Sequence, residues 1–214
     1  MIAAIACWMA LTDPYKVGQK WQYVLTWHYT NKEINSTDEE SFDVEVTKVF
    51  PESVTLKISQ KLTATLFDGN RIPTDPKAVP AVSQWALSPT GSVAFMPNGR
   101  FGLENRFYRI LKGILPAPKG DPDRDKTWVI EYPDDGQGMP QSRLRGLLTK
   151  SGDLWKEFTL AYREKDGTNG IGKFVRLDKQ VFPSRLEVKF TNTKMPGGTD
   201  VVDCDFKMAP KAEK

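Results

Sequence analysis

Apolar and polar side chains alternate with a period of two along most of the chain. From residue 21 to residue 29, the odd positions carry the aromatic and aliphatic side chains Trp, Tyr, Leu, Trp and Tyr, while the positions between them are mostly polar. This alternation predicts a strand with one strongly aromatic face. The same period recurs in segments 42–47, 54–66, 128–132, 144–148, 154–162, 174–177, 186–190 and 202–208. The Asp-Gly pairs at 68–69 and 166–167 are typical of hairpin turns, so the sequence predicts about eleven to thirteen antiparallel strands.

One segment follows helical spacing instead. Its apolar side chains recur three or four positions apart from Leu103 to Ile114, and Pro116 and Pro118 follow them. This pattern predicts one short helix near residues 103–115. The fold class is therefore mainly β, either an antiparallel β-sandwich or a curved half-barrel, built from two β-meanders.

Short matches suggest that the two meanders are related. A Thr-Lys pair at 47–48 and another at 149–150 each precede a turn, a strand and an Asp-Gly pair. The candidate halves are residues 13–115 and 116–208 of a single β-rich domain, although chance similarity between strands remains an alternative. The charged residues 209–214 are predicted to form a disordered tail.

The composition is that of a soluble folded chain. Of 214 residues, 39% are hydrophobic and 27% are charged, and the formal net charge is +3. Lysines and arginines are spread among nearly as many acids, so no nucleic-acid partner is predicted. With one histidine and two cysteines, the sequence offers too few ligands for a typical zinc site, and no metal or cofactor is predicted.

The first residues bear on location. The apolar run 2–11 is too short to span a bilayer, which takes about 20 residues. Ala4 and Ala6 are small residues placed as a signal peptidase requires, and Cys7 follows them, as in the lipobox of bacterial lipoproteins. We therefore interpret residues 1–12 as a signal-peptide remnant, or alternatively as an apolar N-terminus packed on the core. The first interpretation predicts export to the periplasm or cell envelope, with Cys7 as a candidate lipidation site. A disulfide between Cys7 and Cys204 stays open; otherwise Cys204 is a buried structural thiol.

The long aromatic-faced strands and the single apolar helix resemble in shape the incomplete barrels of lipoprotein carriers such as LolA and LolB. In those proteins a curved sheet holds acyl chains and helices plug the opening. The resemblance implies an apolar ligand, with the lining candidates Trp21, Tyr23, Trp27 and Tyr29. Two other interpretations of these rings remain: ordinary core, or exposed platforms that stack on sugars.

Other candidate sites are weaker. The acidic spacing of residues 121–125 lacks the glycine and glutamate of a calcium loop, which favours a solvated turn. His28 lies on the polar side of its strand, which favours a structural role.

Carboxylate chemistry and phosphate binding have little support. Glu45, Asp153 and Glu157 all occupy positions that strands normally turn to water, and no pair of acids stands out. The glycines at 167, 170 and 172 lie between two strands, which predicts a hairpin and not a phosphate loop.

The sequence thus predicts a non-catalytic exported protein that binds an apolar ligand or another envelope component. The alternative is a structural or protein-interaction β-module without a cavity. A carboxylate-dependent hydrolase is the third hypothesis.

Overall fold

The structure is a computed structural model that describes residues 15–51, 53–75, 77–87, 103–115, 126–134, 140–178, 180–194 and 201–212. Within them lie eleven strands and one helix. They are β1 (Lys20–Thr30), β2 (Asn35–Phe50), β3 (Ser53–Phe67), β4 (Asn70–Ile72), β5 (Ala81–Leu87), α1 (Leu103–Ile114), β6 (Thr127–Tyr132), β7 (Ser142–Ser151), β8 (Trp155–Glu164), β9 (Asn169–Leu177), β10 (Arg185–Lys194) and β11 (Val201–Pro210).

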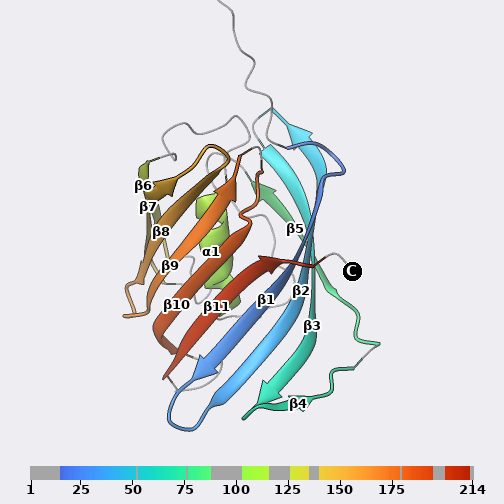
Figure 1. The fold of residues 1–214 in the computed structure, drawn as a ribbon, viewed down its shortest axis with the longest axis vertical. Helices are drawn as coiled ribbons and strands as arrows, with labels where there is room; N and C mark the ends of the chain where they lie inside the picture. The colour runs from blue at the N-terminus through green and yellow to red at the C-terminus, as the bar shows by residue number, and fades with distance from the viewer. Residues whose placement is uncertain are drawn as a thin grey trace, which may run out of the picture.

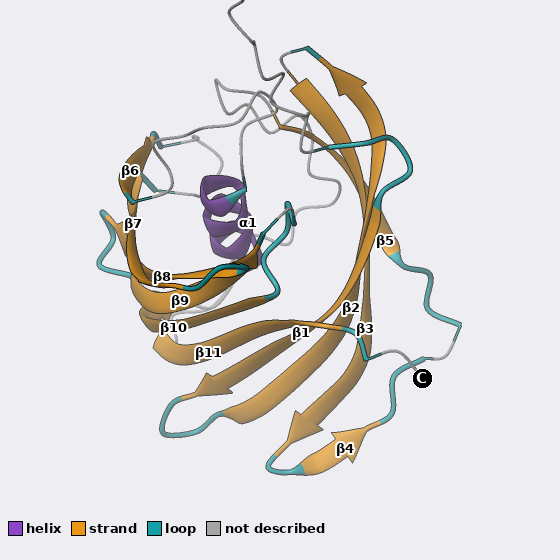
Figure 2. Cartoon of the chain, turned by 45° about the horizontal axis from the view of Figure 1, so that its top comes forward, coloured by secondary structure: helices purple, strands orange, loops and turns teal. Residues whose placement is uncertain are grey.

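All eleven strands belong to one sheet with the order β4-β3-β2-β1-β11-β10-β9-β8-β7-β6, and β5 pairs with β3 beside β4 (Figure 1). Every pairing is antiparallel. The sheet curves around α1, which lies on its concave side (Figure 2). This confirms the curved half-barrel; the sandwich alternative is wrong, because a sandwich needs a second sheet.

Two meanders meet at the centre of the sheet. Strands β1–β4 form the first meander and β6–β11 the second, and they are joined by the pairing of β1 with β11, from Tyr23 opposite Pro210 to Thr30 opposite Asp203. β11 continues through Pro210, and the Lys211 N–H donates to the Gln22 carbonyl beyond it. The predicted start of a disordered tail at residue 209 is therefore wrong, since the central pairing orders these residues.

The two faces of the second meander are cleanly separated. Along β7 and β8, buried and exposed side chains alternate, with aromatic and aliphatic residues inside. Two glycines are needed where neighbouring atoms leave no room for a Cβ. A Cβ on Gly146 would lie 2.2 Å from the Trp128 ring, and one on Gly172 would lie 2.2 Å from the Glu187 carbonyl oxygen.

Both predicted Asp-Gly hairpins are confirmed. Asp68 and Gly69 both have positive φ, 48° and 80°, as a two-residue type I′ turn requires. Gly167, with φ of 99°, lies in the connection between β8 and β9.

The two Thr-Lys pairs occupy the same structural position in their meanders. The β2–β3 register shifts between Val46 and Lys48, and the β7–β8 register shifts between Leu148 and Lys150. At each bulge the threonine hydroxyl donates to a carbonyl of the next strand over 3.1 Å, Thr47 to Thr55 and Thr149 to Glu157. Bulges bend and twist a sheet locally, so both meanders curve at matching points.

Two sequence-based predictions fall outside the described residues: the N-terminal segment 1–12 with Cys7, and the acidic segment 121–125. Within the described part of the chain, no helix is long and apolar enough to cross a membrane.

Candidate ligand-binding interior

The four aromatic residues predicted to line a ligand site all lie on the inner face of β1. Tyr23 and Trp27 are 3% and 1% exposed, within the main core, and burial raises the pKa of the Tyr23 hydroxyl. Trp21 and Tyr29 are half-buried nearer the ends of the strand. The middle of this aromatic face is therefore packed core, while its ends are partly open.

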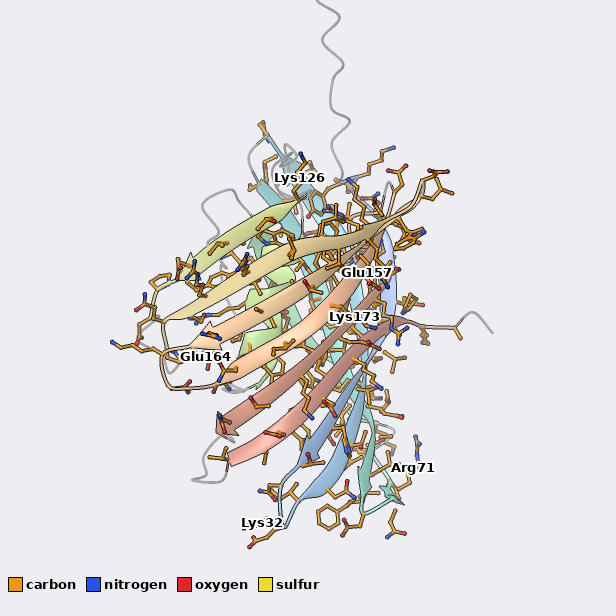
Figure 3. The ribbon with its side chains drawn as sticks, turned by 60° about the vertical axis from the view of Figure 1, so that its left-hand side comes forward. Lys32, Arg71, Lys126, Glu157, Glu164 and Lys173 are labelled. Carbon is orange, nitrogen blue, oxygen red and sulfur yellow. The ribbon has the colours of Figure 1, made fainter. Side chains whose placement is uncertain are left out.

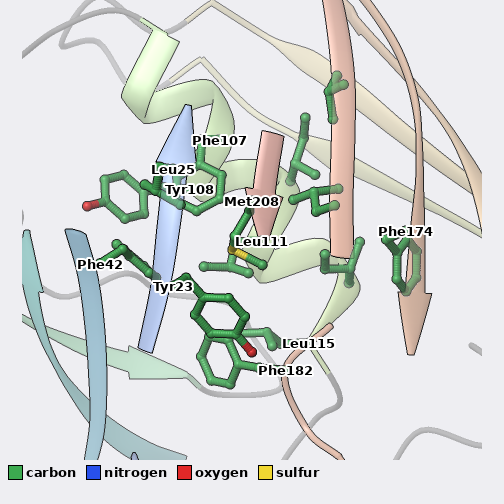
Figure 4. Close-up of a cluster of buried hydrophobic side chains, with 14 of the residues drawn as sticks. Tyr23, Leu25, Phe42, Phe107, Tyr108, Leu111, Leu115, Phe174, Phe182 and Met208 are labelled. Carbon is green, nitrogen blue, oxygen red and sulfur yellow. The ribbon is translucent and has the colours of Figure 1, made fainter. Parts of the chain in front are cut away.

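Rings fill the space between β1 and α1. Trp27 packs 4.3 Å from Phe206, and Phe107 of α1 lies edge-on to Trp27 at 6.0 Å between ring centroids. Phe107 also meets Phe42 of β2 at 5.5 Å, again edge-on. Tyr23, Leu25, Phe42 and Met208 turn toward Phe107 and Leu111 of the helix in the same cluster (Figure 4). Aromatic and aliphatic side chains thus fill the space between the helix and this wall.

A buried ion pair also attaches α1 to β8 of the second meander. The Arg106 Nε and Nη2 donate to Glu164 Oε2 of β8 over 2.8 and 2.6 Å, and the two side chains are only 6% and 0% exposed. Tyr162 donates to the other Glu164 oxygen over 2.6 Å. Burial, and then the Glu164 charge, raises the pKa of the Tyr162 hydroxyl. Asp166 adds a second carboxylate 3.6 Å from Arg106.

The following turn of α1 makes a second polar attachment to the same meander. Arg109 Nη1 donates to the Pro140 carbonyl and to Ser142 Oγ over 2.6 and 2.9 Å. The Tyr132 hydroxyl of β6 donates to the Arg109 carbonyl over 2.7 Å. Burial and the nearby Arg109 lower the pKa of Lys112. These contacts hold the helix firmly to β6–β8.

Toward the first meander, a polar link joins α1 to β3. The Tyr108 hydroxyl donates to Gln60 Oε1 over 2.7 Å, and the Gln60 amide donates in turn to the buried Glu40. Trp85 of β5 lies edge-on to Tyr108 at 4.3 Å. Among the residues that the structure describes, the buried indole nitrogens of Trp27 and Trp85 have no hydrogen-bond partner, and neither has that of Trp128 on β6. Such orphaned donors are uncommon in native interiors and call for an explanation.

The other sequence candidates do not come together. His28 lies on the outer face and its Nδ1 is 2.9 Å from Thr37 Oγ1. Glu45 pairs with Lys20 and Glu157 with Lys150, each at 3.5 Å, and Asp153 is exposed before β8. The three carboxylates therefore form no catalytic pair. The predicted hairpin is confirmed by the pairing of β8 with β9 around Gly167, but Gly170 and Gly172 lie within β9 and not between the two strands.

Cys204 is a free thiol on the inner face of β11 and is fully buried. Burial, and then Asp205, raises the pKa of this thiol. Because the thiolate is the reactive form, we expect Cys204 to resist a maleimide reagent in the folded protein at neutral pH and to react fully in urea. Mass spectrometry of peptides containing Cys204 measures this directly. Rapid labelling of Cys204 without denaturant would contradict the buried position.

A shallow depression of about 320 Å³ opens on the outside of β10 and β11. Its lining consists of Ser184, Arg185, Glu187, Lys207, Met208, Ala209 and Pro210. None of the predicted ligand-lining rings of β1 contributes to it.

Sequence reasoning missed the ionic attachment of α1. Glu164 continues the inward row that Phe158, Leu160 and Tyr162 begin on β8, so a charge at an inward position was a readable signal. Its partner Arg106 lies 58 positions earlier in the chain, and nothing in the sequence joins the two.

Comparisons with known proteins add little. No family model matches the chain, and no curated protein matches it. Among solved structures, the hypothetical protein CT021 from Chlamydia trachomatis is similar over 93% of this chain and 90% of its own, at 13% identity and a TM-score of 0.23. A likeness this weak assigns neither a family nor an activity, so the function is argued from the interior itself.

Proposed function

We propose that the protein is a non-catalytic, exported cell-envelope protein that binds an apolar ligand between α1 and the inner wall of the first meander. One observation carries the proposal: α1 is held to β6–β8 by buried polar contacts, but it meets β1, β2 and β11 through rings and aliphatic side chains. A helix attached in this way can separate from one wall while it stays fixed to the other.

A ligand that enters between α1 and this wall breaks few polar contacts. An acyl chain or a similar apolar group would substitute its own dispersion contacts for those between Phe107 and the rings of Trp27 and Phe42. The link from Tyr108 to Gln60 is the polar contact most exposed to such a change. Separation along this layer is therefore less costly than separation along the buried Arg106–Glu164 pair.

The orphaned indoles support a ligand that also carries an oxygen acceptor. A buried donor left without a partner costs about 1–3 kcal/mol, and the Trp27 and Trp85 nitrogens are both in this state. A carboxylate or ester oxygen could accept from one of them. The ligand we expect is accordingly amphiphilic, with a long apolar chain and an oxygen-containing head.

Export and the absence of catalysis belong to the same proposal. Export is supported by the apolar start and the small residues before Cys7. A non-catalytic role is supported by the placement of His28 outside, hydrogen-bonded to Thr37, and by the pairing of Glu45 and Glu157 with lysines.

The first test is native and denaturing mass spectrometry of the protein purified from its own source. We expect a lipid-sized mass that is present in the native spectrum and lost on denaturation. Titration of the stripped protein with palmitate should then produce a saturable change in tryptophan fluorescence.

Matched variants locate the site. Trp85→Phe removes one orphaned donor and should weaken palmitate binding by roughly three- to tenfold, the equivalent of one modest hydrogen bond. Trp128→Phe removes the corresponding donor on β6, away from the proposed layer, and should leave palmitate affinity unchanged. A bare mass together with no saturable palmitate response would refute ligand binding.

The solid packing of Tyr23 and Trp27 favours a second candidate, a structural or protein-interaction module without a cavity. The two functions predict opposite results in the palmitate titration. A folded chain that binds no palmitate and carries no copurified lipid would support the module.

A further inference from the structure

The outer face of the second meander carries a cluster of cations that the sequence does not display as a run. Arg145 of β7, Arg163 of β8 and Lys189 of β10 are all exposed. Strand pairing places Arg145 and Lys189 in one row across four strands, about 14 Å apart: Arg145 lies opposite Ala161, Ala161 opposite Ile171, and Ile171 opposite Lys189. Arg163 lies two residues beyond Ala161 on β8. Directly opposed residues have Cβ atoms about 4.5–5.5 Å apart.

These three cations lack counter-ions. Nearby charges are already paired, Arg143 with Glu131 at 3.1 Å and Lys173 with Glu187 at 3.5 Å. Within the described part of the chain, Arg145, Arg163 and Lys189 make neither an ion pair nor a side-chain hydrogen bond. Lys189 lies directly opposite Asp205 of β11. Arg145 and Arg163 have no acid directly opposite, so the excess positive charge is centred on β7 and β8.

Aliphatic side chains protrude between the cations. Ile171 is 73% exposed, and Val129 and Leu147 are 44% and 42% exposed on the same outer face. Val129 lies directly opposite Arg145. We define the basic outer patch as Arg145, Arg163 and Lys189 together with Val129, Leu147 and Ile171.

The shape of the sheet decides how this patch can make contact. Because α1 fills the concave side, the basic outer patch lies on the convex side (Figure 2). In Figure 3 the second meander lies in front of α1, with Lys173 and Glu157 labelled on it. A convex surface touches a flat partner at its crest, and Ile171 is the most exposed aliphatic side chain of the basic outer patch.

We propose that the basic outer patch docks on an anionic phospholipid membrane surface. The cations would lie among the lipid phosphates, and the aliphatic side chains would enter the interface between head groups and acyl chains. Nucleic acid fits this patch less well, because a base needs an aromatic ring on which to stack, and the exposed ring on the outer face of β8, Trp155, lies eight residues from Arg163 at the other end of the strand. This inference does not depend on a ligand in the interior.

The test is flotation of the full chain with two sets of vesicles, phosphatidylcholine alone and phosphatidylcholine mixed with phosphatidylglycerol. The wild-type protein should bind the mixed vesicles and not the neutral ones, and added salt should weaken the binding. The triple variant Arg145→Gln/Arg163→Gln/Lys189→Gln should lose roughly fivefold in binding for each charge, about 100-fold together.

The chain offers a matched control. Lys32, Lys57 and Arg71 are exposed cations outside the second meander and make no ion pair or side-chain hydrogen bond in the described part of the chain. Lys32 and Arg71 lie near the lower end of the molecule in Figure 3, below Lys173. Replacing all three by glutamine removes the same net charge, and this control should bind the mixed vesicles almost as well as the wild type.

A further variant separates insertion from charge. Ile171→Asn keeps the charge and the fold, because the side chain is exposed, and it should weaken the vesicle binding that persists at high salt. Equal losses in the two triple variants would overturn the patch, since net charge alone would then explain the binding. Absence of wild-type binding to the mixed vesicles would overturn membrane docking, whereas vesicle binding without palmitate binding would refute only the interior ligand.

Discussion

Trp27→Ala should lower the free energy of unfolding by about 4 kcal/mol, as expected for truncation of a large, fully buried ring. Trp27 packs against Phe107 and Phe206, and with Trp85 it has the largest of the fully buried side chains in the core. Its indole nitrogen has no hydrogen-bond partner, so the loss arises from removed contacts and the resulting cavity. Urea denaturation followed by far-ultraviolet circular dichroism measures it.

Two further substitutions show whether the loss comes from the packing of this ring. Trp27→Phe keeps an aromatic ring in place and should cost clearly less than alanine. Trp21→Ala removes a half-buried ring next to Phe182 and should also cost less. A loss below about 1 kcal/mol for Trp27→Ala would show that the interior can rearrange around β1.

Arg106→Met should destabilise the protein by about 3–5 kcal/mol, because it leaves Glu164 buried without its cation. Methionine preserves much of the arginine volume, so the missing charge is the main change. Thermal and urea denaturation of the variant at neutral pH give the size of the loss.

The double variant Arg106→Met/Glu164→Leu removes both charges and should recover most of the stability. If the double variant does not recover stability, charge burial is not the cause of the loss in Arg106→Met.

The period-two pattern was sufficient for the strands whose two faces differ in polarity. β1 and β8 are examples, because each alternates a buried ring or aliphatic chain with a polar side chain. The first part of β2, from Asn35 to Ser41, is polar on both sides and carried no such signal. Its strand conformation follows from pairing with β1 and β3.

The choice between sandwich and half-barrel depended on contacts distant in the chain. Nothing local to β1 or β11 indicates that they pair with each other, and that single pairing merges the two meanders into one sheet. Only the β1 side of the interior could be predicted from the sequence. The rings of β1 were visible in the alternation, whereas Phe107, Trp85 and the Arg106–Glu164 pair became neighbours through the curvature of the sheet.

The basic outer patch also could not be predicted from the sequence alone. The sequence has no run of lysines and arginines there, and the even spread of charge was used only to argue against a nucleic-acid partner. Alternation turns Arg145 and Arg163 to the same face, and the register then sets Arg163 opposite Arg143 and Arg145 opposite Ala161. The cations of this patch therefore come from different strands of the sheet and not from one run of the sequence.

The pairing of β1 with β11 also constrains how the chain can fold. β1 is among the earliest strands to leave the ribosome, yet one of its two neighbours, β11, is made only after all the other strands. Until then the edge of β1 that carries backbone groups for β11 stays open, and an open edge can pair with another chain. Contacts so far apart in sequence form slowly, because a long loop must close first. The strand at the centre of the finished sheet is thus an unprotected edge during synthesis, which makes this seam the place where a nascent chain is most exposed to mispairing.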